Sequence, residues 1–162
     1  MRNFRRAVEK ILKYKRQEDE YRNFIRKSGF KRASRYLSNL ADEKRVSEQM
    51  ALFTPDAEVI AYIGGKLFAH AKGVGEIEKV FSDYLANFHT VYHLNGQHTA
   101  KILGDTAEGI NYCQVTLIGK QDDAEMINVY GVRYEDSYVK SGGKWQIKKR
   151  VANFMTCDSR KI

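Results

Sequence analysis

The four histidines are the side chains best suited to moving protons in this chain, because a neutral imidazole near pH 7 can both accept and donate a proton. One of them, His93, lies early in a long alternating segment that predicts a β-strand. A single group that takes a proton and then returns it suits an elimination or an isomerisation that needs no cofactor. A surface position or a hydrogen bond within the core would equally explain a histidine there.

An acidic side chain that could orient such an imidazole is Asp42, which precedes Phe53 by 11 residues. A carboxylate that accepts one ring N–H fixes the tautomer of the ring and stabilises the imidazolium. The surrounding segment, Ala-Asp-Glu-Lys at 41–44, is also compatible with a solvated turn or a helix N-cap. Both interpretations of Asp42 stay open at the level of sequence.

A second group of polar side chains lies near position 134. Tyr134 and Asp136 share one face of their predicted strand, because side chains two residues apart point the same way, while Arg133 and Glu135 point the other way. Tyr134 could donate a hydrogen bond to a ligand oxygen, or it could be an aromatic core residue. We expect Arg133 and Arg150 to form structural or interface salt bridges, with Glu135 as one partner.

Two periodicities divide the chain into the helices and strands that must position these residues. Apolar residues three and four apart predict amphipathic helices, and alternating β-branched and aromatic residues predict strands. Thr54-Pro55-Asp56 ends the first helical region, because proline cannot extend a helix. The expected helices are 4–25, 33–40, 44–52 and 73–88, and the expected strands are 57–63, 66–70, 89–103, 107–120, 124–139 and 144–156.

The order of these segments predicts the fold class. The four long strands are separated by sequences typical of tight turns: Gly104-Asp105, Gln121-Asp122-Asp123 and Ser141-Gly142-Gly143. Sequential hairpins of this kind form an antiparallel meander. Helices come first, then a short hairpin, one helix and the meander. We therefore expect an α+β protein whose curved antiparallel sheet packs on N-terminal helices.

The excess positive charge of the chain is confined to its first residues. The net charge is +8 over 162 residues, but residues 1–35 alone carry +9 and the remainder carries −1. We expect residues 1–33 to form a basic amphipathic helical extension that covers the pocket mouth or contacts another subunit; an anchor for nucleic acid or anionic membrane is the alternative. No sequence signature of base recognition is present, so no specific nucleic-acid partner is expected.

The remaining composition limits the other classes of function. The chain is 43% hydrophobic, enough to bury one core, and its longest apolar stretches of about five residues are far short of the ~20 needed to cross a bilayer. The two cysteines, Cys113 and Cys157, lie far apart and outside any Cys/His cluster, so neither a metal site nor a disulfide framework is expected. No secretory signal is visible, and a reducing, cytoplasmic location fits best.

Three short strings occur in order along the chain. They are Leu-Phe-Thr-Pro-Asp-Ala at 52–57, Lys-Leu-Phe at 66–68 with Gly73 and Ile77 after it, and Gly-Val-Arg-Tyr-Glu-Asp at 131–136 followed by Gly-Lys-Trp-Gln-Ile at 143–147 and Arg150. Together they resemble the SnoaL-like family of the nuclear-transport-factor-two-like superfamily, and the last resembles its scytalone-dehydratase-like branch. The resemblance covers roughly 34–158. It implies a cone-shaped, cystatin-like α+β roll (residues 34–162) around one pocket for a small hydrophobic molecule, and a homodimer.

The resemblance also implies roles for individual residues. His93 stands where the dehydratase-like branch carries a pocket histidine, and Asp42 has the spacing of the aspartate that orients it. Val132 and Tyr134 are implied to point inward. Tyr36 resembles the oxyanion tyrosine of ketosteroid isomerases. Further substrate contacts are expected from Asn95, Tyr62 and Asp136.

The chain departs from both branches at one position each. Ala61 stands where a ketosteroid isomerase has its general-base aspartate, and alanine cannot move a proton. Ala41 replaces the tyrosine that precedes the aspartate in the dehydratase-like branch. Two functions remain open, because this cone hosts both enzymes and binders. One is a cofactor-independent lyase or isomerase that acts on a hydrophobic oxygenated ring compound through His/Asp acid–base chemistry. The other is a non-catalytic ligand-binding or protein-interaction module.

Overall fold

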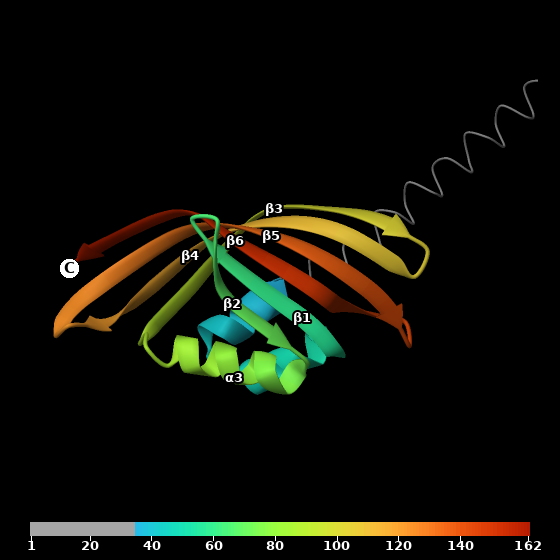
Figure 1. Cartoon of the computed structure of the whole chain (residues 1–162), viewed down its shortest axis with the longest axis horizontal. Coiled ribbons are helices and arrows are strands. Elements are labelled where there is room, and N and C mark those ends of the chain that lie inside the picture. Colours follow the sequence, from blue (N-terminus) through green and yellow to red (C-terminus); the bar gives the residue numbers. More distant parts are fainter. Residues whose placement is uncertain (1–34) are drawn as a thin grey trace, which may run out of the picture.

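A strongly curved six-stranded sheet dominates residues 35–162, the part of the chain that the computed structural model describes (Figure 1). The strand order is β2-β1-β6-β5-β4-β3, and the helices lie against the concave face of the sheet. The strands are β1 (Phe53–Ile63), β2 (Lys66–Lys72), β3 (Thr90–Leu103), β4 (Thr106–Gln121), β5 (Ala124–Ser141) and β6 (Lys144–Lys161). The helices span residues 35–42, α2 (Val46–Gln49), the 3₁₀ turn η1 (Met50–Leu52) and α3 (Val74–Leu85).

The α+β class and the cone-like architecture predicted from the sequence are confirmed, with one refinement to the sheet. All neighbouring strands are antiparallel except β1 and β6, which run parallel. The parallel pair arises because the last strand of the meander returns beside the first hairpin. The basic extension predicted for residues 1–33 lies outside the described residues.

The start of β1 shows how a proline is accommodated in the sheet. Pairing between β1 and β6 is interrupted between Phe53 and Glu58, and Pro55 lies in that interruption. Proline has no N–H to donate, so it is tolerated where no ladder hydrogen bond is needed. The helical region ends at Leu52, as the sequence predicts, but the strand begins directly at Phe53, so Pro55 lies within β1.

Helix α3 closes the concave face through its apolar stripe. Ile77 and Leu85 are buried, and the Phe81 ring packs edge-on against Phe53 at 6.2 Å between centroids. Fully burying a side chain of this size is worth about 1.5–3 kcal/mol. No helix within residues 35–162 is long and apolar enough to cross a membrane.

Two-residue turns set the register of the long hairpins. Gly142 and Gly143, between β5 and β6, have φ angles of 55° and 79°, as a turn of type I′ requires. This turn would place Asp136 opposite Lys149. A bulge between Ser137 and Tyr138 shifts the register by one residue, so that Asp136 lies opposite Arg150 instead.

Candidate active site

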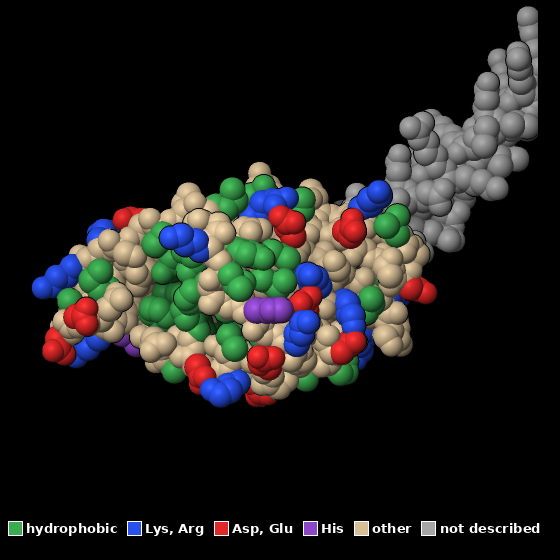
Figure 2. Space-filling view, in the orientation of Figure 1, with side chains coloured by type: hydrophobic (Ala, Val, Ile, Leu, Met, Phe, Trp, Pro, Cys, Tyr) green, Lys and Arg blue, Asp and Glu red, His purple; other side chains and the backbone are tan. Residues whose placement is uncertain are grey.

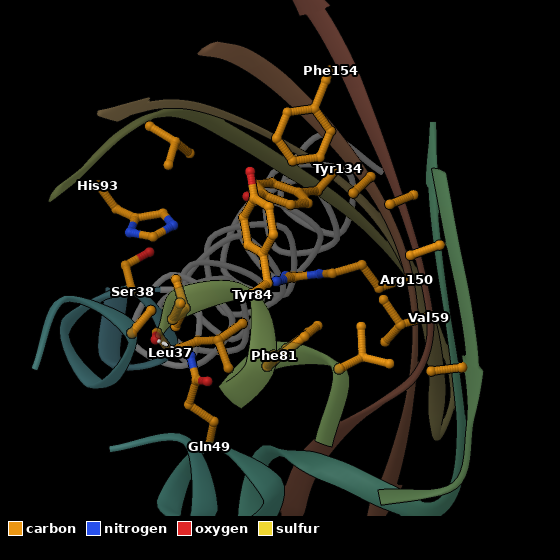
Figure 3. Close-up of a pocket in the computed structure, with 18 of the residues that line it drawn as sticks. Leu37, Ser38, Gln49, Val59, Phe81, Tyr84, His93, Tyr134, Arg150 and Phe154 are labelled. Carbon is orange, nitrogen blue, oxygen red and sulfur yellow. Dashed lines mark hydrogen bonds between the residues drawn. The ribbon is translucent and has the colours of Figure 1, made fainter. Parts of the chain in front are cut away.

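A cavity of about 160 Å³ lies between the concave face of the sheet and the helices (Figure 3). Its wall is mostly apolar, with Phe81 and Leu85 from α3 on one side and Val115 and Leu117 from β4 on the other. Figure 2 shows hydrophobic side chains gathered around a hollow on one face of the molecule. The polar lining residues are few: Ser38, Gln49, Tyr84, His93, Asn111, Tyr134 and Arg150. An apolar cavity with a few convergent polar groups is the usual form of a small-molecule site.

His93 and Asp42 form a hydrogen-bonded pair at the edge of this cavity. Asp42 lies at the end of the 35–42 helix and His93 lies in β3. The distance from His93 Nδ1 to Asp42 Oδ1 is 2.7 Å, and the second carboxylate oxygen, Oδ2, accepts the backbone N–H of His93 at 3.3 Å. The carboxylate thus holds both the ring and the main chain of the same residue.

The pairing determines which ring nitrogen of His93 is basic. An ionised carboxylate can only accept, so neutral His93 carries its proton on Nδ1, and the lone pair is on Nε2. The imidazole points into the cavity in Figure 3, where His93 is one of the lining residues. Asp42 therefore fixes the tautomer of the ring from the side away from the cavity.

A buried ion pair occupies the sheet side of the cavity. The Arg150 guanidinium donates to both carboxylate oxygens of Asp136, from Nε at 2.7 Å and from Nη2 at 2.8 Å, and Tyr138 donates to the same carboxylate at 2.7 Å. Burial alone would lower the pKa of Arg150, but the charge and hydrogen bonds of Asp136 raise it, so the guanidinium stays charged. Arg150 also lies over the Tyr134 ring, 4.5 Å from its centroid.

The two tyrosines of the cavity are hydrogen-bond donors at neutral pH. Burial raises the pKa of both Tyr84 and Tyr134, because a phenolate loses its hydration in an apolar site. Tyr134 comes from β5 and Tyr84 from α3, so they approach the cavity from the sheet and from the helix layer. The Tyr134 hydroxyl can therefore donate to an oxygen of a bound molecule, whereas the Tyr84 hydroxyl is hydrogen-bonded to Tyr130.

A chain of amides positions Ser38 on the helix side. Asn95 donates to the Ser38 hydroxyl at 2.9 Å, and Asn111 donates to the Asn95 carbonyl oxygen at 3.3 Å. Asn111 and Ser38 line the cavity, whereas Asn95 lies behind them. Asn95 thus connects the 35–42 helix to β3 and β4. The sequence predicts that Asn95 contacts the substrate, but Asn95 does not line the cavity.

The structure separates the predicted site residues into two sets. His93 and Tyr134 line the cavity, and Asp42 contacts it only through His93. Tyr36, Val132 and Tyr62 do not line it. Tyr36 is 49% exposed, and the buried Val132 packs in the core. Asp136 is buried as the partner of Arg150, so it reaches the cavity only through that arginine.

Two functional candidates were missed by sequence reasoning. We expected Arg150 only in a structural salt bridge, and its contact with the cavity was hidden by the bulge that changes its partner. Arg150 does form the expected salt bridge, with Asp136, and Arg133 forms one with Glu135. Gln49 was missed because α2 has only four residues, too few for a periodic pattern to show which side is buried. The one available signal for Arg150 was its alternation with Ala152 and Phe154 on a single strand face.

A metal-based site has no support in this part of the chain. Within residues 35–162 no group of three or more His, Cys, Asp or Glu side chains is arranged to hold a metal ion.

Solved structures from several proteins share this fold. A Novosphingobium aromaticivorans protein, provisionally named a scytalone dehydratase, has a TM-score of 0.74 at 19% identity over 86% of this chain and 91% of its own. The hexachlorocyclohexane dehydrochlorinase LinA-type3 of Novosphingobium barchaimii has a TM-score of 0.71 at 12% identity over 87% and 94%. An NTF2-like protein with a cystatin-like fold from Novosphingobium aromaticivorans has a TM-score of 0.66 at 17% identity over 85% and 86%.

Sequence relatives agree with this structural similarity. Uncharacterized proteins of Mycobacterium tuberculosis and Mycobacterium bovis are 28% identical over 115 residues, which is 70% of this chain and 75% of theirs. The family model of the SnoaL-like domain matches residues 32–151, well over half of the chain. This chain therefore belongs to the SnoaL-like domain family.

Proposed function

We propose that this protein is a cofactor-independent lyase or isomerase that acts on a hydrophobic, oxygenated ring compound by proton transfer at His93. The observation that carries the proposal is the 2.7 Å contact between His93 Nδ1 and Asp42 Oδ1 at the wall of an otherwise apolar cavity. An imidazole that faces an apolar cavity and is held from behind by a carboxylate is suited to act as a general base.

The size and lining of the cavity support the substrate class. A cavity of about 160 Å³ resembles the engineered apolar cavities of ~150 Å³ that bind benzene, so its size suits a small ring compound. The apolar side chains favour a hydrophobic ring, and Tyr134 and Arg150 favour an oxygen substituent on it. Two structures of the same fold carry the names of a dehydratase and a dehydrochlorinase, and both names describe eliminations.

The proposed reaction begins with proton abstraction by Nε2 of His93. The lone pair takes a proton from an acidified C–H of the substrate, and the electron pair of that bond passes toward the neighbouring carbon. Asp42 stabilises the imidazolium that forms. Tyr134, as a neutral donor, or Arg150, as a fixed cation, stabilises charge on the substrate oxygen. His93 then returns its proton to the leaving group in an elimination, or to another carbon in an isomerisation.

A generic base-catalysed elimination tests the proposal without knowledge of the natural substrate. In 5-nitrobenzisoxazole, a base removes the ring C–H proton while the N–O bond breaks, and the coloured phenolate that is released can be followed by absorbance. We expect the wild-type protein to accelerate this reaction and His93→Gln to lose the acceleration, because a general base is typically worth 10²–10⁴-fold. Asp42→Asn should lower the rate as well.

The matched control is His70→Gln, which changes an exposed histidine paired with Glu58 on the β1–β2 hairpin. That variant should retain the wild-type rate. Equal rates for the wild type, His93→Gln and His70→Gln would contradict the proposal. A cavity that binds 5-nitrobenzisoxazole without accelerating its elimination would favour the alternative, a non-catalytic binding module.

A further inference from the structure

Gln49 lines the cavity and carries one hydrogen-bond acceptor that the proposed proton transfer does not use. The residue is 2% exposed and lines the cavity from α2. Its side-chain nitrogen, Nε2, donates to the backbone carbonyl oxygen of Leu37 at 2.8 Å. Its carbonyl oxygen, Oε1, is buried and has no hydrogen-bond partner among residues 35–162.

The contact with Leu37 fixes which end of the Gln49 amide is left unpaired. A carbonyl oxygen can only accept, so the NH₂ end must face Leu37, and a flipped amide would place two oxygens against each other. Oε1 therefore remains an acceptor. Buried acceptors are nearly always satisfied, so an unpaired one at a cavity wall marks a position where a ligand atom is expected to donate.

Gln49 and His93 act on different parts of a bound molecule. In Figure 3 the two side chains are well separated, with Ser38 and Leu37 between them. They come from different layers, α2 and β3. A ligand that meets His93 with an acidic C–H can thus meet Gln49 with a second substituent.

We propose that Gln49 determines specificity by accepting a hydrogen bond from a hydroxyl group of the ligand, away from the carbon that His93 deprotonates. The inference rests on the proposed function in taking this cavity as the substrate site, and it narrows the substrate class to ring compounds that carry a hydroxyl group. An analogue with a methyl group in place of the hydroxyl leaves Oε1 unpaired and binds less well than its apolar surface predicts.

The test compares two probes of equal size, phenol and toluene, which differ only in hydroxyl against methyl. Their dissociation constants are measured by NMR titration for the wild type, Gln49→Met and Gln49→Asn. We expect the preference for phenol over toluene to fall about threefold to tenfold in Gln49→Met, the value of one neutral hydrogen bond. Gln49→Asn should also lower the preference for phenol, because the shorter side chain moves the acceptor away from the ligand while the site stays polar.

The matched control is Gln146→Met, the same change at a glutamine that also donates to backbone carbonyls, those of Ala51 and Phe53, but does not line the cavity. Its phenol preference should equal that of the wild type. An unchanged preference in both Gln49 variants would overturn the inference. The comparison requires no proton transfer, so a cavity that fails to accelerate the elimination of 5-nitrobenzisoxazole could still show the Gln49 effect.

Discussion

Breaking the buried ion pair behind the cavity should destabilise the protein far more than breaking an exposed pair in the same sheet. The side chains of Asp136 and Arg150 are 1% and 8% exposed, and two charge-assisted hydrogen bonds join them. In Arg150→Met the carboxylate keeps only the donor from Tyr138. Removing one partner of a buried pair typically costs 3–5 kcal/mol, because the remaining charge is left uncompensated in an apolar site.

The control for this prediction is the pair formed by Arg133 and Glu135, which are 28% and 48% exposed. Arg133→Met makes the same chemical change where water can solvate the remaining carboxylate, so we expect a loss of no more than about 1 kcal/mol. The double variant Asp136→Leu with Arg150→Met should recover much of the loss of the single one, because no unpaired charge remains.

Chemical denaturation measures these differences directly. The chain has a single tryptophan, Trp145 in β6, whose fluorescence can report the unfolding of the sheet. The free energy of unfolding follows from the denaturant midpoint and slope. Equal losses for Arg150→Met and Arg133→Met would refute the reasoning, and so would a double variant less stable than the sum of its single changes.

Two further predictions concern single titratable groups. Burial raises the pKa of the Cys113 thiol to about 12, while Cys157 is exposed. A thiol reagent at pH 8 should therefore label Cys157 quickly in the native state and both cysteines after unfolding. Rapid labelling of both cysteines in the native state would contradict this prediction. The hydrogen bond from Lys149 is the largest of the contacts that lower the pKa of Glu58 to about 2. The stabilisation that the ionised Glu58 carboxylate gives to the folded protein is therefore complete above pH 4.5 and is lost as the pH falls toward 2. Glu58→Gln should flatten this acid loss in a pH series of thermal melts, whereas Glu78→Gln on α3 should leave it unchanged.

The fold was predictable because its signals are local. Alternation identified the four long strands, and the turn residues between them identified an antiparallel meander. The observed ends of these strands differ from the predicted ends by up to five residues, with the largest difference at the end of β6. The parallel contact between β1 and β6 was not predictable in this way, because it joins segments about 90 residues apart and no turn connects them.

The site was only partly predictable, because it depends on contacts across the sequence. His93 and Asp42 are 51 residues apart, and family resemblance suggested their pairing where spacing could not. Tyr36 was suggested by the same kind of resemblance, yet its side chain faces solvent. Arg150 required knowledge of a one-residue bulge, and Gln49 required the position of a four-residue helix.

The central claim of this account is that Asp42 holds His93 with a basic nitrogen toward the cavity. Nitrogen-15 NMR of the imidazole measures this directly, because it distinguishes a protonated ring nitrogen from one with a lone pair. We expect neutral His93 to carry its proton on Nδ1 in the wild type. In Asp42→Asn the amide oxygen should satisfy the backbone N–H of His93, which turns the NH₂ toward Nδ1 and moves the proton to Nε2. A wild-type ring protonated on Nε2, or a tautomer that is the same in both proteins, would contradict the account.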